Sequence, residues 1–232
     1  MLMTQELTTT EKSSECKPVH KALLRVDAPI REVPERHRDR ILRHLLALDE
    51  RDRYLRFGYM ANDAQIERYV NSLDFSHDEL YGVYDNQLEL VALAHLAYSE
   101  DPEHRECAEF GGSVNKSERG RGLGQQLFDR AVLHCRNRGV YLLFIYALSE
   151  NKTMLRIARN AGATVERSGS ESEAHLVLPE ATVATRIEEM LDDGVARTDY
   201  RIKQQVRQFW TFLDFLHDLR HGAAAGRQQS GR

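Results

Sequence analysis

The chain has 232 residues, of which 41% are hydrophobic and 29% charged, with 32 Lys and Arg against 36 Asp and Glu. This is the balance of an ordinary globular protein, so it argues against intrinsic disorder and against nucleic-acid binding driven by bulk positive charge. The longest apolar run, 140–148, is about half as long as a membrane-spanning helix, and the N-terminus has no apolar centre typical of a secretory signal.

Cysteine usage points to a reducing compartment. The three cysteines, Cys16, Cys107 and Cys135, lie far apart and are odd in number. This pattern is typical of reduced thiols rather than of a disulfide framework, so we expect a cytoplasmic protein. No Cys-x-x-Cys pair occurs, and the ten histidines follow no metal-ligand spacing, so we assign no metal site.

Composition divides the chain into four parts. Residues 1–18 are rich in Thr, Ser, Glu and Lys and predict a mobile N-terminal arm, and residues 220–232 predict a mobile tail. Between them we expect one domain over 19–179 and a helical extension over 180–219. The end of this extension spaces apolar residues three and four apart, which predicts a helix that either folds back or meets a second copy: Ile202, Val206, Phe209, Leu213 and Leu216.

Two helices are predicted in the first part of the domain. Residues 34–48 have helical periodicity and begin at Pro34, a residue that suits the first turn of a helix. A second helix is predicted over 62–72, with Asn62 as its N-cap.

Strands are predicted next. Residues 80–84 and 88–97 predict a hairpin around Asp85-Asn86, a turn pair that tolerates positive φ. Residues 106–114 alternate apolar and other positions, as a strand does.

The remaining pattern alternates between helix and strand. It predicts a helix over 123–135, a strand over 140–147, a helix over 150–161 and a strand over 174–178. The strand over 140–147 is almost entirely apolar, which is typical of a central strand covered on both faces. Gly139 and Gly162 follow the two helices and suit left-handed caps. We therefore expect an α/β or α+β sheet with helices on both faces.

A glycine-rich loop stands between the strand over 106–114 and the helix that follows it. Its sequence is Arg119-Gly120-Arg121-Gly122-Leu123-Gly124. Glycines let a ligand approach the backbone closely, and the free N–H groups of a helix's first turn favour an anion such as phosphate. Gln125 stands where the dinucleotide fingerprint needs glycine, and the chain has no Gly-Lys-Ser/Thr tripeptide, so neither of these nucleotide loops fits.

The spacing Arg-x-x-Gly-x-Gly at 119, 122 and 124, followed by a helix, an apolar strand, Asn151 and Gly162, resembles the GNAT superfamily of acyl-CoA-dependent N-acetyltransferases. The resemblance covers about residues 21–178. It implies a mixed, mostly antiparallel sheet of about seven strands flanked by helices and splayed between strands 4 and 5. It also implies acetyl-CoA as co-substrate and no metal.

The resemblance also implies where the co-substrate binds. The pyrophosphate would lie on the amides of the glycine-rich loop, and the pantetheine arm would pair with the end of the preceding strand. We expect a bulge at Gly111-Gly112 to splay the two strands. The expected cofactor-binding residues are Ser113, Val114, Asn115, Arg119, Gly120, Arg121, Gly122, Leu123, Gly124, Gln125 and Asn151.

Catalytic roles follow from the same resemblance. Family members often carry a carboxylate on the strand that holds Glu109, and its apolar neighbours would raise its pKa, so Glu109 is the candidate base; the alternative is a solvated strand carboxylate. The N–H of Val114 is the candidate oxyanion donor. The tyrosine that many members use as acid is Ala158 here, so Tyr146 is a candidate substitute; the alternative is a core aromatic.

The acceptor is the least determined part. The segment 51–57 resembles the catalytic domain of bacterial protein-lysine acetyltransferases. The alternative is that Tyr54, Leu55 and Phe57 pack the first helix against the sheet, and we prefer it for Tyr54 and Phe57. We therefore expect acetyl transfer to a primary amine of a small molecule or of a protein lysine, by direct attack in a ternary complex. The alternative is a non-catalytic acyl-CoA-binding or protein-interaction module. We expect no nucleic-acid or membrane partner, and a candidate partner is a second copy bound through the C-terminal helix.

Overall fold

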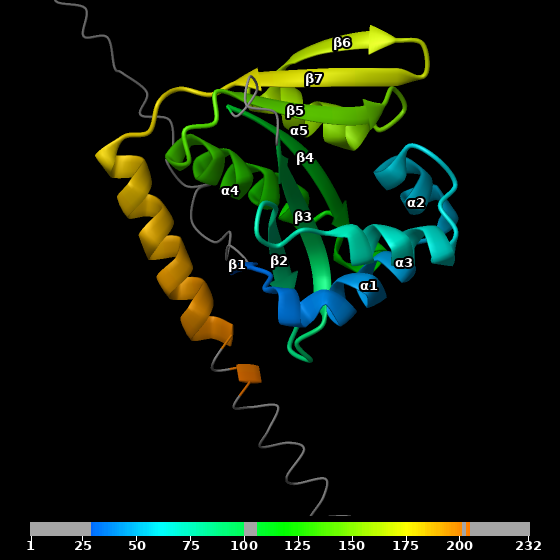
Figure 1. The fold of residues 1–232 in the computed structure, drawn as a ribbon, viewed down its shortest axis with the longest axis horizontal. Helices are drawn as coiled ribbons and strands as arrows, with labels where there is room; N and C mark the ends of the chain where they lie inside the picture. Colours follow the sequence, from blue (N-terminus) through cyan, green and yellow to red (C-terminus); the bar gives the residue numbers. More distant parts are fainter. Residues whose placement is uncertain (1–28, 100–105, 201–202, 205–232) are drawn as a thin grey trace, which may run out of the picture.

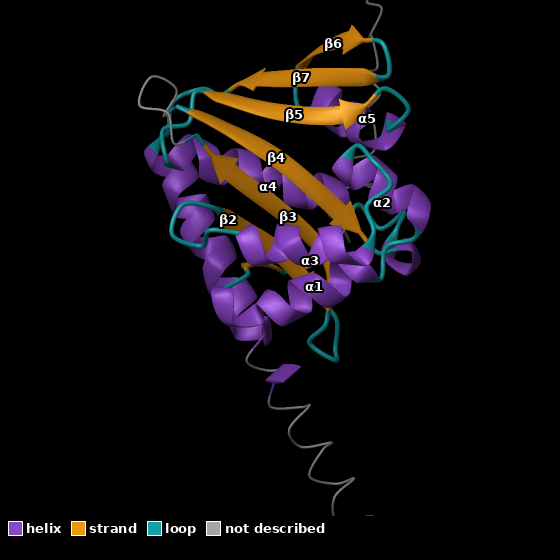
Figure 2. Ribbon diagram, turned by 45° about the vertical axis from the view of Figure 1, so that its right-hand side comes forward, coloured by secondary structure: helices purple, strands orange, loops and turns teal. Residues whose placement is uncertain are grey.

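The computed structural model describes residues 29–99, 106–200 and 203–204. It contains a seven-stranded sheet in the order β1-β2-β3-β4-β5-β7-β6, with helices packed on both faces (Figures 1 and 2). The pair β4 and β5 is parallel, and the other neighbouring strands are antiparallel. This is the mixed, mostly antiparallel sheet that the family resemblance implies. The expected arm over 1–18, the expected tail over 220–232 and most of the apolar pattern over 198–219 lie outside the described residues.

The first half of the fold holds three strands and most of the helices on one face. The elements are β1 (Ile30–Glu32), η1 (Glu35–His37), α1 (Arg38–Leu46), α2 (Glu50–Phe57), α3 (Asp63–Ser72), β2 (Glu79–Tyr84) and β3 (Leu90–Tyr98). Helix α3 begins at the predicted cap: Asn62 Oδ1 accepts from the Gln65 N–H at 3.0 Å, and the Gln65 side chain accepts from the Asn62 N–H at 2.9 Å. These reciprocal bonds form a capping box, which fixes the first turn.

Helix α2 was not predicted from periodicity. None of its residues is fully buried, and its apolar residues are confined to its second half. Its ends are nevertheless marked in the sequence: the Asp49 side chain accepts from the Asp52 N–H at 2.9 Å, and Gly58 closes the helix with φ of 80°. The two caps, rather than hydrophobic periodicity, were the available signal.

The hairpin between β2 and β3 differs from the predicted turn. Positive φ falls on Leu88, at 62°, and not on Asp85 or Asn86. The Asp85 carboxylate accepts from the N–H groups of Gln87 and Glu89, each at 2.9 Å, so its side chain organises a longer loop. An Asp that bonds its own following backbone replaces the two-residue turn.

The second half supplies the remaining strands and the helices of the opposite face. The elements are β4 (Cys107–Val114), η2 (Lys116–Glu118), α4 (Leu123–Asn137), β5 (Leu142–Leu148), α5 (Lys152–Asn160), β6 (Thr164–Ser168) and β7 (Glu171–Val177). Strand β6 was missed because Thr164–Ser168 holds a single apolar residue, Val165, as an edge strand can. Gly139 and Gly162 both have the predicted positive φ.

Two apolar clusters hold the sheet between its helices. Behind the sheet, Phe110 of β4 meets Phe128 of α4 edge to face, with ring centroids 5.0 Å apart. In front, Ile41 and Ile66 pack on Leu93 of β3 within a second cluster. Burying side chains of this size contributes about 1.5–3 kcal/mol each, so these two clusters stabilise the packing of the helices on the sheet.

The prediction that β5 is covered on both faces was wrong. Leu143 and Ile145 are buried, but Tyr146, the next residue along the strand, is 58% exposed. Helices α1 and α3 lie over the β2 and β3 side of the sheet and leave this part of β5 open (Figure 2). The open face matters because it carries the pocket described below.

A helix over residues 183–200 lies beside α4 (Figure 1, gold to orange). It is held there by polar contacts: Arg130 donates to Asp193 at 2.7 Å, and Asn137 donates to Glu189 at 2.6 Å. Its other side presents large apolar side chains to solvent, namely Val183, Ile187, Met190, Leu191 and Val195. In the part of the chain that the structure describes, no helix is long and apolar enough to cross a membrane.

His134 connects this helix to the domain. Its Nδ1 lies 2.5 Å from Glu189 of the C-terminal helix, and its Nε2 forms an ion pair with Glu79 of β2. Burial opposes the charge of His134, but the hydrogen bonds and charges of Glu79 and Glu189 outweigh burial and raise its pKa. The imidazolium therefore bridges two carboxylates across the interface.

We expect this bridge to make stability depend on pH. Because the folded pKa of His134 is raised, its contribution is fully present below the unfolded value of about 6.5 and is lost as pH rises through the folded value. His134→Gln should lower the free energy of unfolding by about 1–3 kcal/mol at low pH, with a smaller difference at alkaline pH. Urea unfolding across this pH range measures the difference.

The matched control is His175→Gln, on β7. His175 lies outside the bridge between Glu79 and Glu189, so this variant should not reproduce the pH-dependent difference. A difference between the unmodified chain and His134→Gln that stays constant with pH would contradict the bridging role.

Candidate active site

Strands β4 and β5 separate part-way along their length. Strand β4 pairs with β3 from Ala108 to Val114, but with β5 only from Cys107 to Glu109. The register between β3 and β4 is continuous, so the expected bulge at Gly111-Gly112 was wrong. The strands splay because their parallel pairing ends at Glu109, and the opening lies beside the second half of β4 (Figure 2).

The backbone of β4 offers donors to this opening. The Asn115 N–H donates to the Val91 carbonyl at 2.9 Å, which fixes the hydrogen-bonding phase of the ladder with β3. Since successive amides of a strand point to opposite sides, the Val114 N–H points away from β3, toward the side from which β5 has separated. This is the direction that the candidate oxyanion donor requires.

The glycine-rich loop has the backbone that a phosphate cradle needs. Gly120 has φ of 78° and Gly122 has φ of 84°, conformations that side chains disfavour. Gly122 is the N-cap of α4, and no side chain caps the helix there. The first-turn N–H groups of a 15-residue helix are therefore available to an anion at its positive end.

The two loop arginines are less free than expected. Arg119 forms an ion pair with Asp52 of α2, and Arg121 forms one with Glu118. The positive charge that we expected at the loop is thus partly balanced by carboxylates. Asp52 is only 11% exposed, so its pairing with Arg119 joins α2 to the loop.

The neighbouring predicted residues have local roles. Leu123 is buried, and a Cβ on Gly124 would lie 3.4 Å from Ile157 Cδ1, so both residues serve close packing of α4. Gln125 donates to Asp129 at 2.8 Å along the helix. The side-chain oxygen of Asn115 is buried without a hydrogen-bond partner among the described residues, and it lies at the end of β4.

Ser113 is held by a histidine that sequence reasoning missed. His44 Nε2 lies 2.8 Å from Ser113 Oγ, and His44 Nδ1 lies 3.1 Å from the Leu90 carbonyl oxygen. Burial lowers the pKa of His44 to about 4, so the ring is neutral. Nδ1 then donates to Leu90, and Ser113 donates to Nε2. The bond fixes the Ser113 side chain toward α1.

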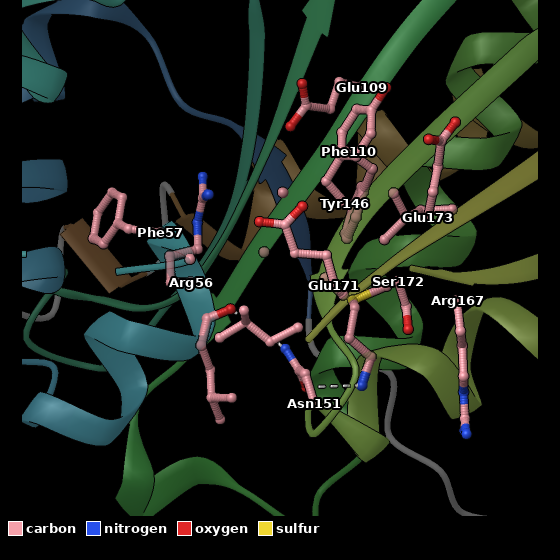
Figure 3. A pocket seen from close by; sticks show the side chains of 18 of the residues that line it. Arg56, Phe57, Glu109, Phe110, Tyr146, Asn151, Arg167, Glu171, Ser172 and Glu173 are labelled. Carbon is pink, nitrogen blue, oxygen red and sulfur yellow. Dashed lines mark hydrogen bonds between the residues drawn. The ribbon is translucent and has the colours of Figure 1, made fainter. Parts of the chain in front are cut away.

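A pocket of about 560 Å³ opens beside Glu109. Arg56 and Phe57 of α2 line it from one side, and Tyr146 and Glu173 line it from the other (Figure 3). Further lining residues are Leu55, Gly58, Phe110, Gly111, Gly112, Ile145, Ala147, Leu148, Asn151, Met154, Glu166, Arg167, Glu171 and Ser172. The splay, the end of segment 51–57 and both candidate catalytic residues thus lie around one pocket.

Glu109 and Tyr146 have environments that suit proton transfer. Glu109 is exposed to solvent at the pocket; partial burial raises its pKa, and the positive charge of Arg56 acts in the opposite direction. Burial, followed by the negative charges of Glu173 and Glu109, raises the pKa of Tyr146. The Tyr146 ring stacks on Phe144 with ring centroids 6.2 Å apart, and the residue is exposed and lines the pocket, so the alternative of a core aromatic was wrong.

Asn151 connects the pocket to two helices. Its Oδ1 accepts from the Met154 N–H at 3.1 Å and so caps α5, while its Nδ2 lies 3.5 Å from the Leu55 carbonyl oxygen of α2. Ala158, at the position of the usual tyrosine, is fully buried. Within the described ranges, no group of three or more His, Cys, Asp or Glu side chains is placed to hold a metal ion.

Residues 42–163 match the family described as Acetyltransferase (GNAT) family. The chain belongs to the GNAT family. The match covers the glycine-rich loop, Asn151 and Gly162, which carried the resemblance, and also the strands that splay. Members of this family are acyltransferases, so the chain is an enzyme of that class, and the fold binds acetyl-CoA.

Solved structures show the same GNAT fold. The GNAT domain of S. lividans PAT is 18% identical, with 64% of this chain and 89% of that chain covered and a TM-score of 0.55. Ribosomal-protein-alanine N-acetyltransferase from Brucella melitensis is 14% identical, with 64% and 99% covered and a TM-score of 0.52. A GNAT-family acetyltransferase from Streptococcus pneumoniae is 13% identical, with 65% and 98% covered and a TM-score of 0.52.

Proposed function

We propose that this GNAT enzyme transfers an acetyl group to a primary amine of a small molecule or of a protein lysine, by direct attack in a ternary complex. The observation that carries the proposal is that Glu109 lines the pocket where β4 and β5 separate, and that the Val114 N–H, further along the same strand, points into the gap that β5 leaves. A base and an oxyanion donor on one strand are the two groups that amine attack on a thioester requires.

Each residue has a defined task. Glu109 takes a proton from the attacking ammonium, and its raised pKa brings it nearer to the working pH. The Val114 N–H donates to the carbonyl oxygen as negative charge develops. Tyr146 Oη donates a proton to the departing sulfur, although a thiol of pKa about 8.5 leaves readily with little help.

The residues present fit acetyl-CoA, which supplies the activated acetyl thioester when bound. The N–H groups around Gly120 and Gly122 take the phosphates, with Arg119 and Arg121 beside them. The main chain from Ser113 to Asn115, which faces the gap left by β5, pairs with the pantetheine arm.

Thiol release measured over an amine library tests the proposal. The library contains polyamines, amino acids, aminoglycosides and lysine peptides. We expect saturable release that requires both acetyl-CoA and one class of amine. Binding of acetyl-CoA without release for any amine would instead favour the alternative, a non-catalytic acyl-CoA-binding module.

We also propose that the helix over residues 183–200 pairs with a second copy. Met190 and Leu191 are 74% and 66% exposed on the side that faces away from α4. Large apolar side chains grouped on one helix face usually mark an interface. Light scattering of the full chain measures the mass: twice the chain mass supports the proposal, and the monomer mass contradicts it.

A further inference from the structure

The Arg56 side chain packs closely against the wall of the pocket. Its guanidinium lies against the main chain of β4: a Cβ on Gly111 would be 2.8 Å from its Cζ, Nη1 and Nη2. Only glycine leaves this space, and the φ of Gly111 is not positive, so the backbone conformation is not what requires glycine there. The close approach of Arg56 therefore depends on the absence of a side chain at Gly111.

A chain of polar side chains fixes this position. Arg56 Nη2 donates to Tyr69 Oη at 2.9 Å, and Tyr69 Oη lies 2.9 Å from His95 Nδ1. His95 Nε2 lies 3.1 Å from Asp78 Oδ2. Burial and the Arg56 charge lower the pKa of His95, so the ring is neutral. Since arginine only donates, Tyr69 must donate to His95, and His95 Nε2–H faces Asp78.

The Arg56 guanidinium has N–H donors that remain available to a ligand. Within the described parts of the chain, no carboxylate lies within ion-pair distance of Arg56, and its hydrogen bond to Tyr69 uses Nη2 alone. The other lining cation, Arg167, points away from the space between Arg56 and Tyr146 (Figure 3). Arg56 is thus a positively charged group, available to bind an anionic group of a ligand, on the wall opposite Tyr146 and Glu173.

We propose that Arg56 binds a carboxylate that the acceptor carries close to its reacting amine, and that Tyr69 is a positioning residue for Arg56. This deepens the proposed function and rests on it. The planar guanidinium suits a carboxylate, with which it forms charge-assisted bonds, while the amine lies toward Glu109. The carboxylate comes either from a free amino acid or from an acidic residue beside a lysine in a polypeptide.

Matched acceptor pairs test the proposal. One arm compares amino acids with their carboxamides, and the other compares lysine peptides that have Glu or Gln beside the lysine. We expect the carboxylate member of one arm to have a KM lower by about tenfold or more. Arg56→Gln should abolish this preference. Because the substitution also removes a positive charge that lowers the pKa of Glu109, the two members of a pair are compared within each enzyme. The two members of a pair differ in the basicity of the amine as well as in the carboxylate. This difference is the same for the unmodified enzyme and for a variant, so a change in preference between the two enzymes reports the carboxylate alone.

Two further variants test the placement of Arg56 without removing its charge. Gly111→Ala displaces the guanidinium, and Tyr69→Phe removes its hydrogen-bond partner. Both should reduce the preference, and Tyr69→Phe should have no further effect on it when Arg56 is already Gln. Arg68→Gln, which removes an exposed charge beside Tyr69 on α3, is the matched control and should keep the preference.

The outcomes separate the two proposals. Equal use of carboxylate and carboxamide by the unmodified enzyme, or a preference that survives Arg56→Gln, overturns the role of Arg56. If no amine is acetylated, the proposed function fails, and calorimetric binding of the same pairs in the presence of CoA decides the role of Arg56 alone. Tighter binding of the carboxylates that disappears in Arg56→Gln supports it, and equal binding overturns it.

Discussion

Glu109→Gln should lower kcat/KM by about 10²–10⁴-fold, which is the range that a single general base contributes. The glutamine keeps the size of the side chain and its place in the pocket, but it cannot accept the proton of the amine. The loss should be greatest at low pH, where the acceptor amine is protonated and a base is most needed. The rate should recover partly as pH approaches the pKa of the amine itself.

The pH profile provides the measurement. Since burial raises the pKa of Glu109, kcat/KM of the unmodified enzyme should rise with pH through that raised value, as Glu109 loses its proton. The variant should lack this limb. Glu106→Gln, which changes an exposed carboxylate near the start of β4, is the matched control. An unchanged pH profile in Glu109→Gln would assign the base to another group or to solvent.

Gly122→Trp should raise the Kd for CoA by about tenfold or more, since each lost charge-assisted bond to phosphate costs about 1.5–3 kcal/mol. A side chain at this position covers the first-turn N–H groups of α4. It also strains the backbone, because φ at Gly122 is 84°. Calorimetric titration with CoA measures the affinity.

Gly139→Trp separates the two effects. Gly139 follows the other end of α4, has φ of 80°, and a Cβ added there would meet no heavy atom within 4 Å. Both variants should therefore lose a similar amount of stability from backbone strain, about 1–2 kcal/mol. Only Gly122→Trp should lose affinity for CoA. Equal affinity in the two variants would remove the glycine-rich loop from the cofactor site.

The sequence predicts best where local rules act alone. Asn62 and Gly139 were recognised as caps because capping depends on the few residues around them. The exposure of Tyr146 was not predictable in this way. An apolar run shows that a strand is buried, but it does not show whether a helix from elsewhere in the chain covers each face.

The same distinction applies to the candidate site. The glycine-rich loop is readable because its positive φ angles and its place at the start of α4 depend on residues that are adjacent in the sequence, whereas Glu109 was named from the family resemblance. The bond between His44 and Ser113 joins residues 69 positions apart, and the bond between Tyr69 and His95 spans 26. Such pairs depend on how α1 and α3 pack on the sheet, which no local pattern specifies.

The ion pair between Arg119 and Asp52 joins the glycine-rich loop to the first turn of α2, the helix that also carries Arg56. Asp52 lies in the first turn of this helix and Arg56 in its last. A phosphate that takes hydrogen bonds from Arg119 competes with Asp52 for the same guanidinium. If cofactor binding changes the free energy of acceptor binding through this competition, acceptor binding must change the free energy of cofactor binding by an equal amount, because thermodynamic linkage is reciprocal.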